Sequence, residues 1–115
     1  MEKKFSIELL EEAVEFIENL DDKPKSKILY NLNLASRSKD SNLFKKLNED
    51  IWEFRTLYNK QHYRLFAFWD KSDKEDTLVI CSHGIIKKTN KIPQKSINKA
   101  ESIRNQYFEE KNKKK

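Results

Sequence analysis

Apolar residues recur at intervals of three and four near the start of the chain. Between positions 9 and 20 this spacing gathers them on one side of a helix, and glutamates fill the positions between. The apolar residues of this stripe are Leu10, Ala13, Val14, Ile17 and Leu20. The pattern predicts an amphipathic helix over residues 9–20. Before it, Phe5 and Ile7 alternate with polar neighbours, which is consistent with a short strand over residues 3–8.

A second helix is predicted to begin near Pro24. Asp21 and Asp22 precede this proline and can cap a helix, and proline is tolerated in a first helical turn because the N–H it lacks would be unpaired there. The apolar side of this helix carries Ile28, Leu29, Leu32 and Ala35. Residues 36–42 are polar and indicate a turn.

The pattern then changes to aromatic and β-branched runs. Residues 51–57 and 63–69 predict two strands of a hairpin that is joined near Asn59 to His62. Residues 77–81 (TLVIC) form an apolar run with charged residues before it and Gly84 after it. This run predicts a third strand, buried on both faces.

Pro93 precedes a last helical pattern, after which Lys111 to Lys115 are predicted to fray into a basic tail. The apolar side of this helix carries Ile97, Ala100, Ile103 and Tyr107. These elements predict an α+β fold with helices packed on a small antiparallel sheet of three to four strands and a C-terminal helix. We expect a single domain over residues 1–110 with a tail over 111–115, and one sheet face available for a ligand.

Composition narrows the range of functions. The chain has 115 residues, a single glycine and a single cysteine, Cys81. One glycine cannot build a glycine-rich phosphate loop, and one cysteine excludes an internal disulfide and a thiolate metal cluster. The two histidines, His62 and His83, fall on different predicted elements, so we expect neither a metal site nor a cofactor. No long apolar run or signal peptide is present, which predicts a cytoplasmic protein without a membrane partner.

Charge is distributed unevenly along the chain. The net charge is +5, yet residues 87–115 hold 10 Lys and Arg against 3 Asp and Glu, while the preceding residues hold 14 against 16. The C-terminal quarter therefore carries +7 and the rest −2. Clustered cations attract polyanions, which favours a phosphate-bearing or acidic partner for this quarter. The final lysines fit contact with RNA and a purely solubilising role equally well.

Cations on or just beyond the predicted strands are the main candidates for chemistry. These are Arg55, Arg64, Lys87, Lys88 and Lys91, with Tyr63 and His83 among them. RNA cleavage needs no metal when the neighbouring 2′-OH attacks, because the protein then has only to align it, move protons and stabilise negative charge. The alternative is structural: Arg55 pairs with Glu53 or Asp50, Arg64 is an ordinary strand cation, and the lysines form a solvated turn. Cys81, in mid-strand, fits a small core residue better than a nucleophile.

Three motifs carry a family resemblance over about residues 44–104. They are Trp52-Glu53-Phe54-Arg55, then Tyr63-Arg64-Leu65-Phe66, then the run HGIIKKTNKIP from His83 to Pro93. In this order they resemble the motifs of RelE/HigB-type toxins, in the phage-derived HigB-like branch. The N-terminal helices match that branch in pattern and length alone.

The resemblance implies a RelE-like fold and the toxin role in a type II toxin–antitoxin system. Such toxins are ribosome-dependent endoribonucleases that cleave mRNA without a metal and inhibit translation. The implied partners are the ribosome, mRNA and a cognate antitoxin, often a helix-turn-helix protein. Two alternatives stay open: a noncatalytic RNA- or ribosome-binding module, and a corepressor that acts with a DNA-binding antitoxin.

The same resemblance implies roles for individual residues. Arg64 matches the arginine that faces the scissile phosphate, and Lys87 and Lys88 match the cationic pair that stabilises developing charge. Arg55 matches a strand arginine that holds a phosphate or the active conformation. The remaining candidates for RNA binding are Tyr63 and Lys91.

The general base is not assigned by the resemblance. RelE carries a tyrosine near the start of its final helix region, where this chain has Gln94, Lys95 and Ser96. His83, Lys87 and Lys91 are the candidates to accept the proton. His83 fits a catalytic proton donor or acceptor as well as a residue that bonds the backbone at a strand end.

Overall fold

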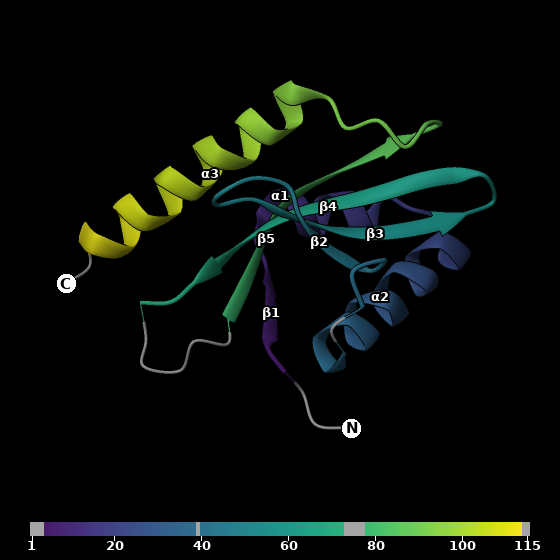
Figure 1. Cartoon of the computed structure of the whole chain (residues 1–115), viewed down its shortest axis with the longest axis horizontal. Helices are drawn as coiled ribbons and strands as arrows, with labels where there is room; N and C mark the ends of the chain where they lie inside the picture. The colour runs from purple at the N-terminus through teal and green to yellow at the C-terminus, as the bar shows by residue number, and fades with distance from the viewer. Residues whose placement is uncertain (1–3, 39, 73–77, 114–115) are drawn as a thin grey trace.

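A five-stranded sheet forms the centre of the molecule in the computed structural model, which describes residues 4–38, 40–72 and 78–113 (Figure 1). The strands are β1 (Ser6–Leu9), β2 (Phe44–Lys46), β3 (Trp52–Tyr58), β4 (Gln61–Asp70) and β5 (Leu78–Lys87). The helices are α1 (Glu11–Glu18), α2 (Asp22–Arg37) and α3 (Gln94–Lys113). None of the helices in these ranges is long and apolar enough to cross a membrane.

The strands run in the order β1-β5-β4-β3-β2, and the sheet is mixed. β1 is parallel to β5, whereas the other neighbours are antiparallel. The α+β prediction is confirmed, but the predicted sheet was too small and its all-antiparallel arrangement is wrong. β1 confirms the short strand expected before the first helix, which the alternation had placed at residues 3–8, whereas β2 has three residues, too few for a two-residue period to be recognised in the sequence.

The helices cover both faces of the sheet. Along β4, Leu65 and Ala67 belong to the core that α1 and α2 cover, whereas Phe66 and Phe68 belong to a second core with Ala100 of α3. Neighbouring residues of a strand point to opposite faces, so α3 lies on the face away from α1 and α2. The expectation of one face free for a ligand is therefore corrected, because α3 occupies part of it.

The predicted helical stripes are buried in part. In α1, Ala13 and Ile17 are buried while Val14 is 39% exposed, and in α2, Ile28 is buried while Leu29 is 45% exposed. The outcome reflects the helix period, since a residue next to the centre of a stripe turns about 100° away from the sheet. Both helices begin and end within a few residues of the predicted positions.

The β3–β4 hairpin closes as predicted, through a tight two-residue turn. Tyr58 pairs with Gln61, and the turn residues Asn59 and Lys60 have φ angles of 51° and 65°. Two consecutive left-handed residues match the twist of a hairpin, and asparagine adopts this conformation more readily than most residues. This short turn fixes the register of the two long strands.

A bulge in β5 decides which side chains reach the α3 face. Phe66 pairs with His83 and Ala67 pairs with Cys81, so Ser82 is the extra residue, and its Oγ donates to the Phe66 carbonyl at 3.2 Å. Beyond the bulge the alternation shifts by one, which turns His83 and Lys87 toward the α3 face.

Gly84 does not end the third strand, as the sequence had suggested, because β5 continues to Lys87. A Cβ at Gly84 would lie 2.4 Å from the ring of Phe16, so glycine is what allows α1 to pack closely against β5. The predicted start of this strand, Thr77, lies outside the described residues.

α3 extends further than predicted. It is helical through Lys113, so a tail that begins to fray at Lys111 is incorrect. The Lys111 Nζ lies 2.6 Å from the carboxylate of Asp70, and the Tyr107 hydroxyl donates to the same carboxylate at 2.6 Å. These contacts hold the last turns of α3 against the end of β4. Lys114 and Lys115 lie outside the described residues.

Candidate functional site

A cavity of about 250 Å³ opens on the α3 face, near the β3–β4 hairpin. Its lining residues are Asn42, Arg55, Leu57, His62, Arg64 and Asn90. Two of them, Arg55 and Arg64, are residues that the sequence analysis selected. The cavity therefore brings the two predicted arginines together, with a histidine and two amides that were not selected.

Strand register places these side chains on one face. Arg55 lies directly opposite Arg64, and Leu57 lies directly opposite His62. Side chains that face each other across two antiparallel strands project from the same side of the sheet. Residues two positions apart in a strand project from the same side, so Arg55 and Leu57 share one face, and so do His62 and Arg64.

Arg64 is buried, with 2% of its surface exposed, and it forms an ion pair with Glu53, which is 3% exposed. Arg64 Nε lies 3.1 Å from Glu53 Oε1, although neither atom has a hydrogen-bond partner of good geometry among the described residues. Burial raises the pKa of Glu53, because desolvation outweighs the attraction of Arg64, Arg55 and Lys45. Arg64 is thus a buried, paired cation, which distinguishes it from the ordinary strand cation of the structural alternative.

Asn90 joins the two arginines. Its Oδ1 accepts a hydrogen bond from Arg55 Nη2 at 3.2 Å and a second one from Arg64 Nη2. A single oxygen therefore lies between two guanidinium groups, which is an arrangement that a phosphate oxygen could also adopt. Arg55 also lies 3.7 Å from Glu53, as one of the structural alternatives foresaw, and its side chain is 23% exposed.

His62 completes the cavity beside Arg64. Its Nδ1 lies 3.3 Å from Arg64 Nη2, and its side chain is partly exposed. Arg64 also donates to the Tyr63 carbonyl at 3.3 Å. The guanidinium therefore contacts Tyr63, His62 and Asn90 in addition to Glu53, and these contacts fix its position at the cavity wall.

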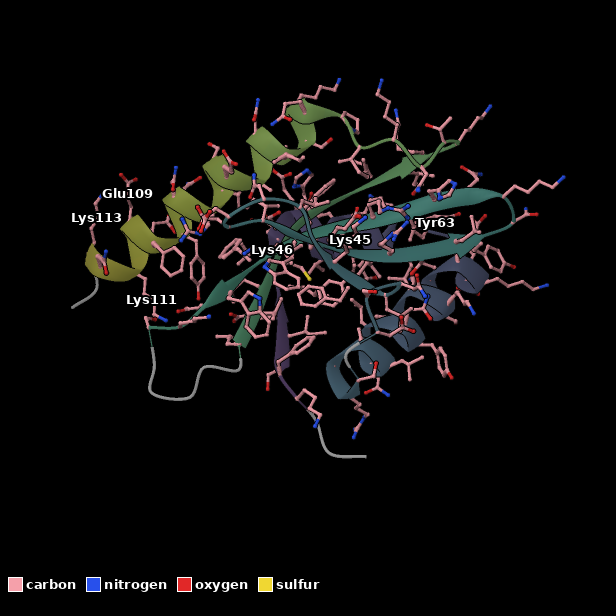
Figure 2. All side chains as sticks on the ribbon, viewed as in Figure 1. Lys45, Lys46, Tyr63, Glu109, Lys111 and Lys113 are labelled. Atoms are coloured by element: carbon pink, nitrogen blue, oxygen red, sulfur yellow. The ribbon has the colours of Figure 1, made fainter. Side chains whose placement is uncertain are left out.

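Four lysines lie on the sheet face of the cavity or on the loop that carries Asn90. Lys87 lies opposite His62 in the register, on the same face, and Lys88 and Lys91 are exposed on the loop 88–93 that carries Asn90. Lys45 of β2 lies opposite Glu53, so it belongs to this face as well (Figure 2). The sequence analysis missed Lys45 because the strand that positions it is three residues long.

Two predicted site residues lie elsewhere. Tyr63 projects to the opposite face, into the core under α1 and α2, and is 7% exposed. His83 is 4% exposed and stacks on Phe66, with the ring centroids 4.9 Å apart, and its Nδ1 lies 3.1 Å from Ser82 Oγ. Burial, assisted by Lys99, lowers the pKa of His83 to about 4. Neither residue lines the cavity at Arg64.

The residues that sequence reasoning missed had weak signals. His62 lies two positions before Arg64, and the two-residue period of a strand would have placed both on one face. Asn90 lies inside the lysine-rich motif but carries no charge, so a search for cations passed over it. Glu53 was considered only as a partner of Arg55, and its burial depends on the sheet.

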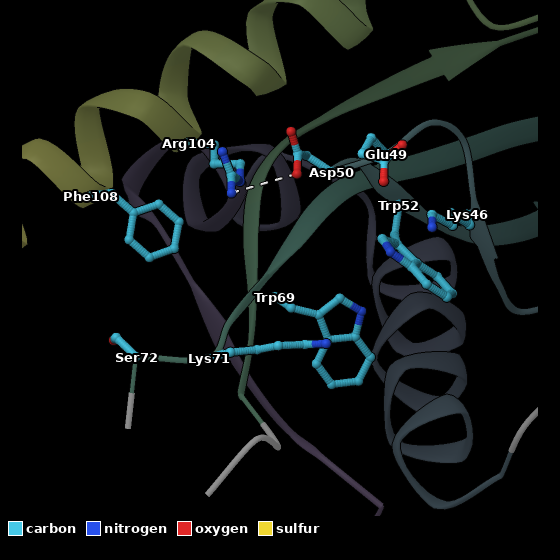
Figure 3. A pocket seen from close by; sticks show the side chains of 9 residues that line it. All are labelled: Lys46, Glu49, Asp50, Trp52, Trp69, Lys71, Ser72, Arg104 and Phe108. Carbon is cyan, nitrogen blue, oxygen red and sulfur yellow. Dashed lines mark ion pairs between the residues drawn. The ribbon is translucent and has the colours of Figure 1, made fainter. Parts of the chain in front are cut away.

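A second cavity, of about 450 Å³, lies between the end of β4 and α3 (Figure 3). Two tryptophans, Trp52 and Trp69, contribute to its wall, and Lys71 Nζ lies 5.9 Å from the centre of the Trp69 ring. Across the cavity, Arg104 and Asp50 form an ion pair at 3.6 Å. Acidic and basic side chains are nearly balanced here. They are not balanced in the first cavity, lined by Arg55 and Arg64, which is called the arginine-rich cavity below.

Other candidate chemistry has little structural support in the described ranges. No group of three or more His, Cys, Asp or Glu residues in residues 4–38, 40–72 and 78–113 could hold a metal ion. Cys81 is fully buried in the core, and burial raises the pKa of its thiol, as expected for a packing residue.

The comparisons with known proteins identify the family. No curated protein is matched by the chain. The family model described as phage derived protein Gp49-like (DUF891) matches residues 15–105 of the 115, a range that contains every residue of the arginine-rich cavity. The chain therefore belongs to the phage-derived Gp49-like family, within the RelE/HigB-like toxin superfamily.

Proposed function

We propose that this chain is the toxin of a type II toxin–antitoxin system and a ribosome-dependent endoribonuclease that cleaves mRNA without a metal. The observation that carries the proposal is the pair of arginines, Arg55 and Arg64, at one cavity on the part of the sheet that α3 leaves open. Membership of a toxin superfamily supports the same role.

The proposed reaction is a transphosphorylation within the RNA. The 2′-oxygen of one nucleotide forms a bond to the neighbouring phosphorus, and the bond from phosphorus to the 5′-oxygen breaks. The products are a 2′,3′-cyclic phosphate and a 5′-hydroxyl, so one proton leaves the 2′-OH and one reaches the 5′-oxygen. Negative charge grows on the phosphate oxygens, and two fixed guanidinium groups stabilise such charge better than mobile cations.

The surrounding lysines supply the remaining attraction for RNA. Lys87 and Lys45 lie on the face of the cavity, and Lys88 and Lys91 extend the positive charge along the adjacent loop. Contacts of this kind bind the phosphate backbone and do not read bases. In this proposal the partners are the ribosome with its mRNA and a cognate antitoxin, which we expect to be a helix-turn-helix protein. The proposed site of action is the cytoplasm.

The test is induced expression in a bacterial host, with the 5′ ends of mRNA mapped by primer extension. Arg55→Ala is the informative variant, because Arg55 is partly exposed and its removal leaves the Arg64–Glu53 pair in place. We expect new ends inside reading frames for the wild type and at least about a hundredfold slower cleavage for Arg55→Ala, the size typical of a lost charge-stabilising donor. Lys87→Ala should weaken cleavage in the same direction.

Arg37→Ala is the matched control. It removes the same side chain from α2, on the other side of the sheet, where Arg37 donates to Asn33 at 3.3 Å. We expect it to cleave like the wild type. Growth and transcripts that stay unchanged with folded wild-type protein would contradict the proposal, and co-sedimentation with ribosomes in that case would support the noncatalytic RNA-binding module.

A further inference from the structure

We infer that His62 is the general base of this cavity, the group that takes the proton of the 2′-OH. The inference rests on the proposed function and assigns a step that the family resemblance leaves unassigned. It starts from the lining of the cavity: Asn42, Arg55, Leu57, His62, Arg64 and Asn90. Amides and an aliphatic side chain accept no proton near neutral pH, and arginine stays protonated, so among these lining residues the histidine alone suits the task.

The contact with Arg64 defines which ring nitrogen is available. A guanidinium can only donate, so His62 Nδ1, 3.3 Å from Arg64 Nη2, is the accepting nitrogen and carries no proton. The ring hydrogen of the neutral imidazole is then on Nε2. A proton on Nδ1 would place two donors against each other, which means that Arg64 keeps His62 in the form that a base requires.

Binding of a phosphate changes this arrangement. Arg64 Nε lies against Glu53, whereas the terminal nitrogens of Arg64 contact His62, Asn90 and the Tyr63 carbonyl, which are neutral acceptors. An anionic phosphate is a stronger acceptor than any of these. When Arg64 Nη2 donates to the phosphate in place of His62, the lone pair of Nδ1 becomes free beside the reacting group.

The proton transfer then balances as follows. Nδ1 takes the proton from the 2′-OH as the 2′-oxygen bonds to phosphorus, and the imidazole becomes an imidazolium. The charged groups that face His62 are cations from three strands: Arg64 of β4, Arg55 of β3 and Lys87 of β5. The bound phosphate supplies the negative charge that offsets them and the imidazolium. The 5′-oxygen receives its proton from water or from the same imidazolium.

The other candidates are less well placed. His83 is buried and does not line the cavity, and the loop residue Lys91 is exposed to solvent. Lys87 lies opposite His62 across the strands and not in the lining.

The experiment compares His62→Asn with His62→Ala and wild type on ribosomes programmed with a defined mRNA, in single-turnover cleavage over a range of pH. The Oδ1 of asparagine reproduces the acceptor at Nδ1 but cannot take up a proton. We expect both variants to cleave about 10²- to 10⁴-fold more slowly than wild type, the usual contribution of a general base. The wild-type rate should depend on one ionisation that both variants lack, and the half-saturating ribosome concentration should change little.

The outcomes separate this inference from the proposed function. Cleavage by His62→Asn within about threefold of wild type, with the same pH profile, would overturn the inference and leave the proposed function standing. Loss in His62→Ala with recovery in His62→Asn would also overturn it, because the histidine would then only position Arg64. No cleavage by folded wild type would overturn both. If His62→Asn does not fold, His62→Ala still decides, because cleavage by this variant within about threefold of wild type would overturn the inference.

Discussion

Two buried carboxylates of this small domain have very different surroundings. Asp70, at the end of β4, accepts hydrogen bonds from Tyr107, Lys111 and both the backbone N–H and the hydroxyl of Ser72, at 2.5 to 3.0 Å. Burial alone would raise the pKa of Asp70, but these bonds outweigh it and hold that pKa well below its ordinary value. Glu53 lies against two arginines, yet burial prevails there and raises its pKa.

The difference separates a fully bonded network from a partly bonded ion pair. Both carboxylate oxygens of Asp70 accept hydrogen bonds, and those from Tyr107 and Lys111 anchor α3 to the sheet. At Glu53 and Arg64 an acceptor and a donor are buried without good hydrogen bonds in the described part of the chain. Buried polar atoms with unmet bonding capacity are costly in folded proteins, so the Glu53–Arg64 pair is the less fully compensated of the two regions.

Removing Arg64 should have the largest effect on stability. Arg64→Ala leaves the buried carboxylate of Glu53 with Arg55 alone, at 3.7 Å. Breaking a buried pair in this way typically costs about 3–5 kcal/mol of unfolding free energy. Urea denaturation of the purified protein measures this loss.

A double variant provides the control for that measurement. Arg64→Met with Glu53→Met replaces both charges by apolar groups of similar size, which is often neutral for stability. We expect it to unfold near the wild-type midpoint while cleavage is lost. A double variant as unstable as Arg64→Ala would show that the pair itself stabilises the fold and would weaken the contrast with Asp70.

His83 should make stability depend on pH over a defined range. Its pKa is lowered from 6.5 to about 4 in the folded protein, by burial first and then by Lys99, with Glu12 acting in the opposite direction. The unfolded chain therefore binds more protons between these values, so stability is lost as the pH falls from about 6.5 to about 4. The shift corresponds to about 3 kcal/mol. Urea denaturation at a series of pH values measures it.

His83→Gln isolates this contribution, because glutamine can bond Ser82 and does not titrate. The difference in unfolding free energy between wild type and His83→Gln should move in favour of the variant by about 3 kcal/mol as the pH falls through this range. A difference that stays constant with pH would show that His83 is accessible to protons in the folded state.

The sequence carried enough information for the long elements and not for the sheet edges. The three helices and the β3–β4 hairpin have strong periodicity, and each was located within a few residues. At one edge of the sheet, the alternation at residues 3–8 indicated the strand β1 but not its parallel pairing with β5. At the other edge, β2 has three residues, too few for a local pattern to predict. The placement of α3 on the second face likewise depends on packing between distant residues.

For the candidate site, the sequence identified charges but not their burial. Arg55 and Arg64 were found because charge on a predicted strand is visible in the sequence. His83 and Tyr63 were selected by the same reasoning, but the Ser82 bulge and the strand alternation direct them into packed regions. The alternation of side chains between the two sheet faces shifts by one residue at the bulge in β5, and no residue type in the sequence predicts this shift.

Asp70→Asn gives the smallest of these effects and tests the other side of the comparison. The variant keeps the shape of the side chain but loses the charge that accepts from Lys111 and Tyr107, so we expect a cost of about 1.5–3 kcal/mol at pH 7. Because the folded pKa of Asp70 is depressed, its stabilisation is present above the unfolded value of about 3.9 and is lost as the pH falls below it. The stability of the wild type should therefore approach that of the variant in acid.

Tyr107→Phe, which leaves the carboxylate and Lys111 in place, should cost about 1 kcal/mol at neutral pH. If Asp70→Asn were as stable as wild type at pH 7, the anchor at α3 would contribute no more than the partly satisfied pair at Glu53, and the distinction between the two regions would fail.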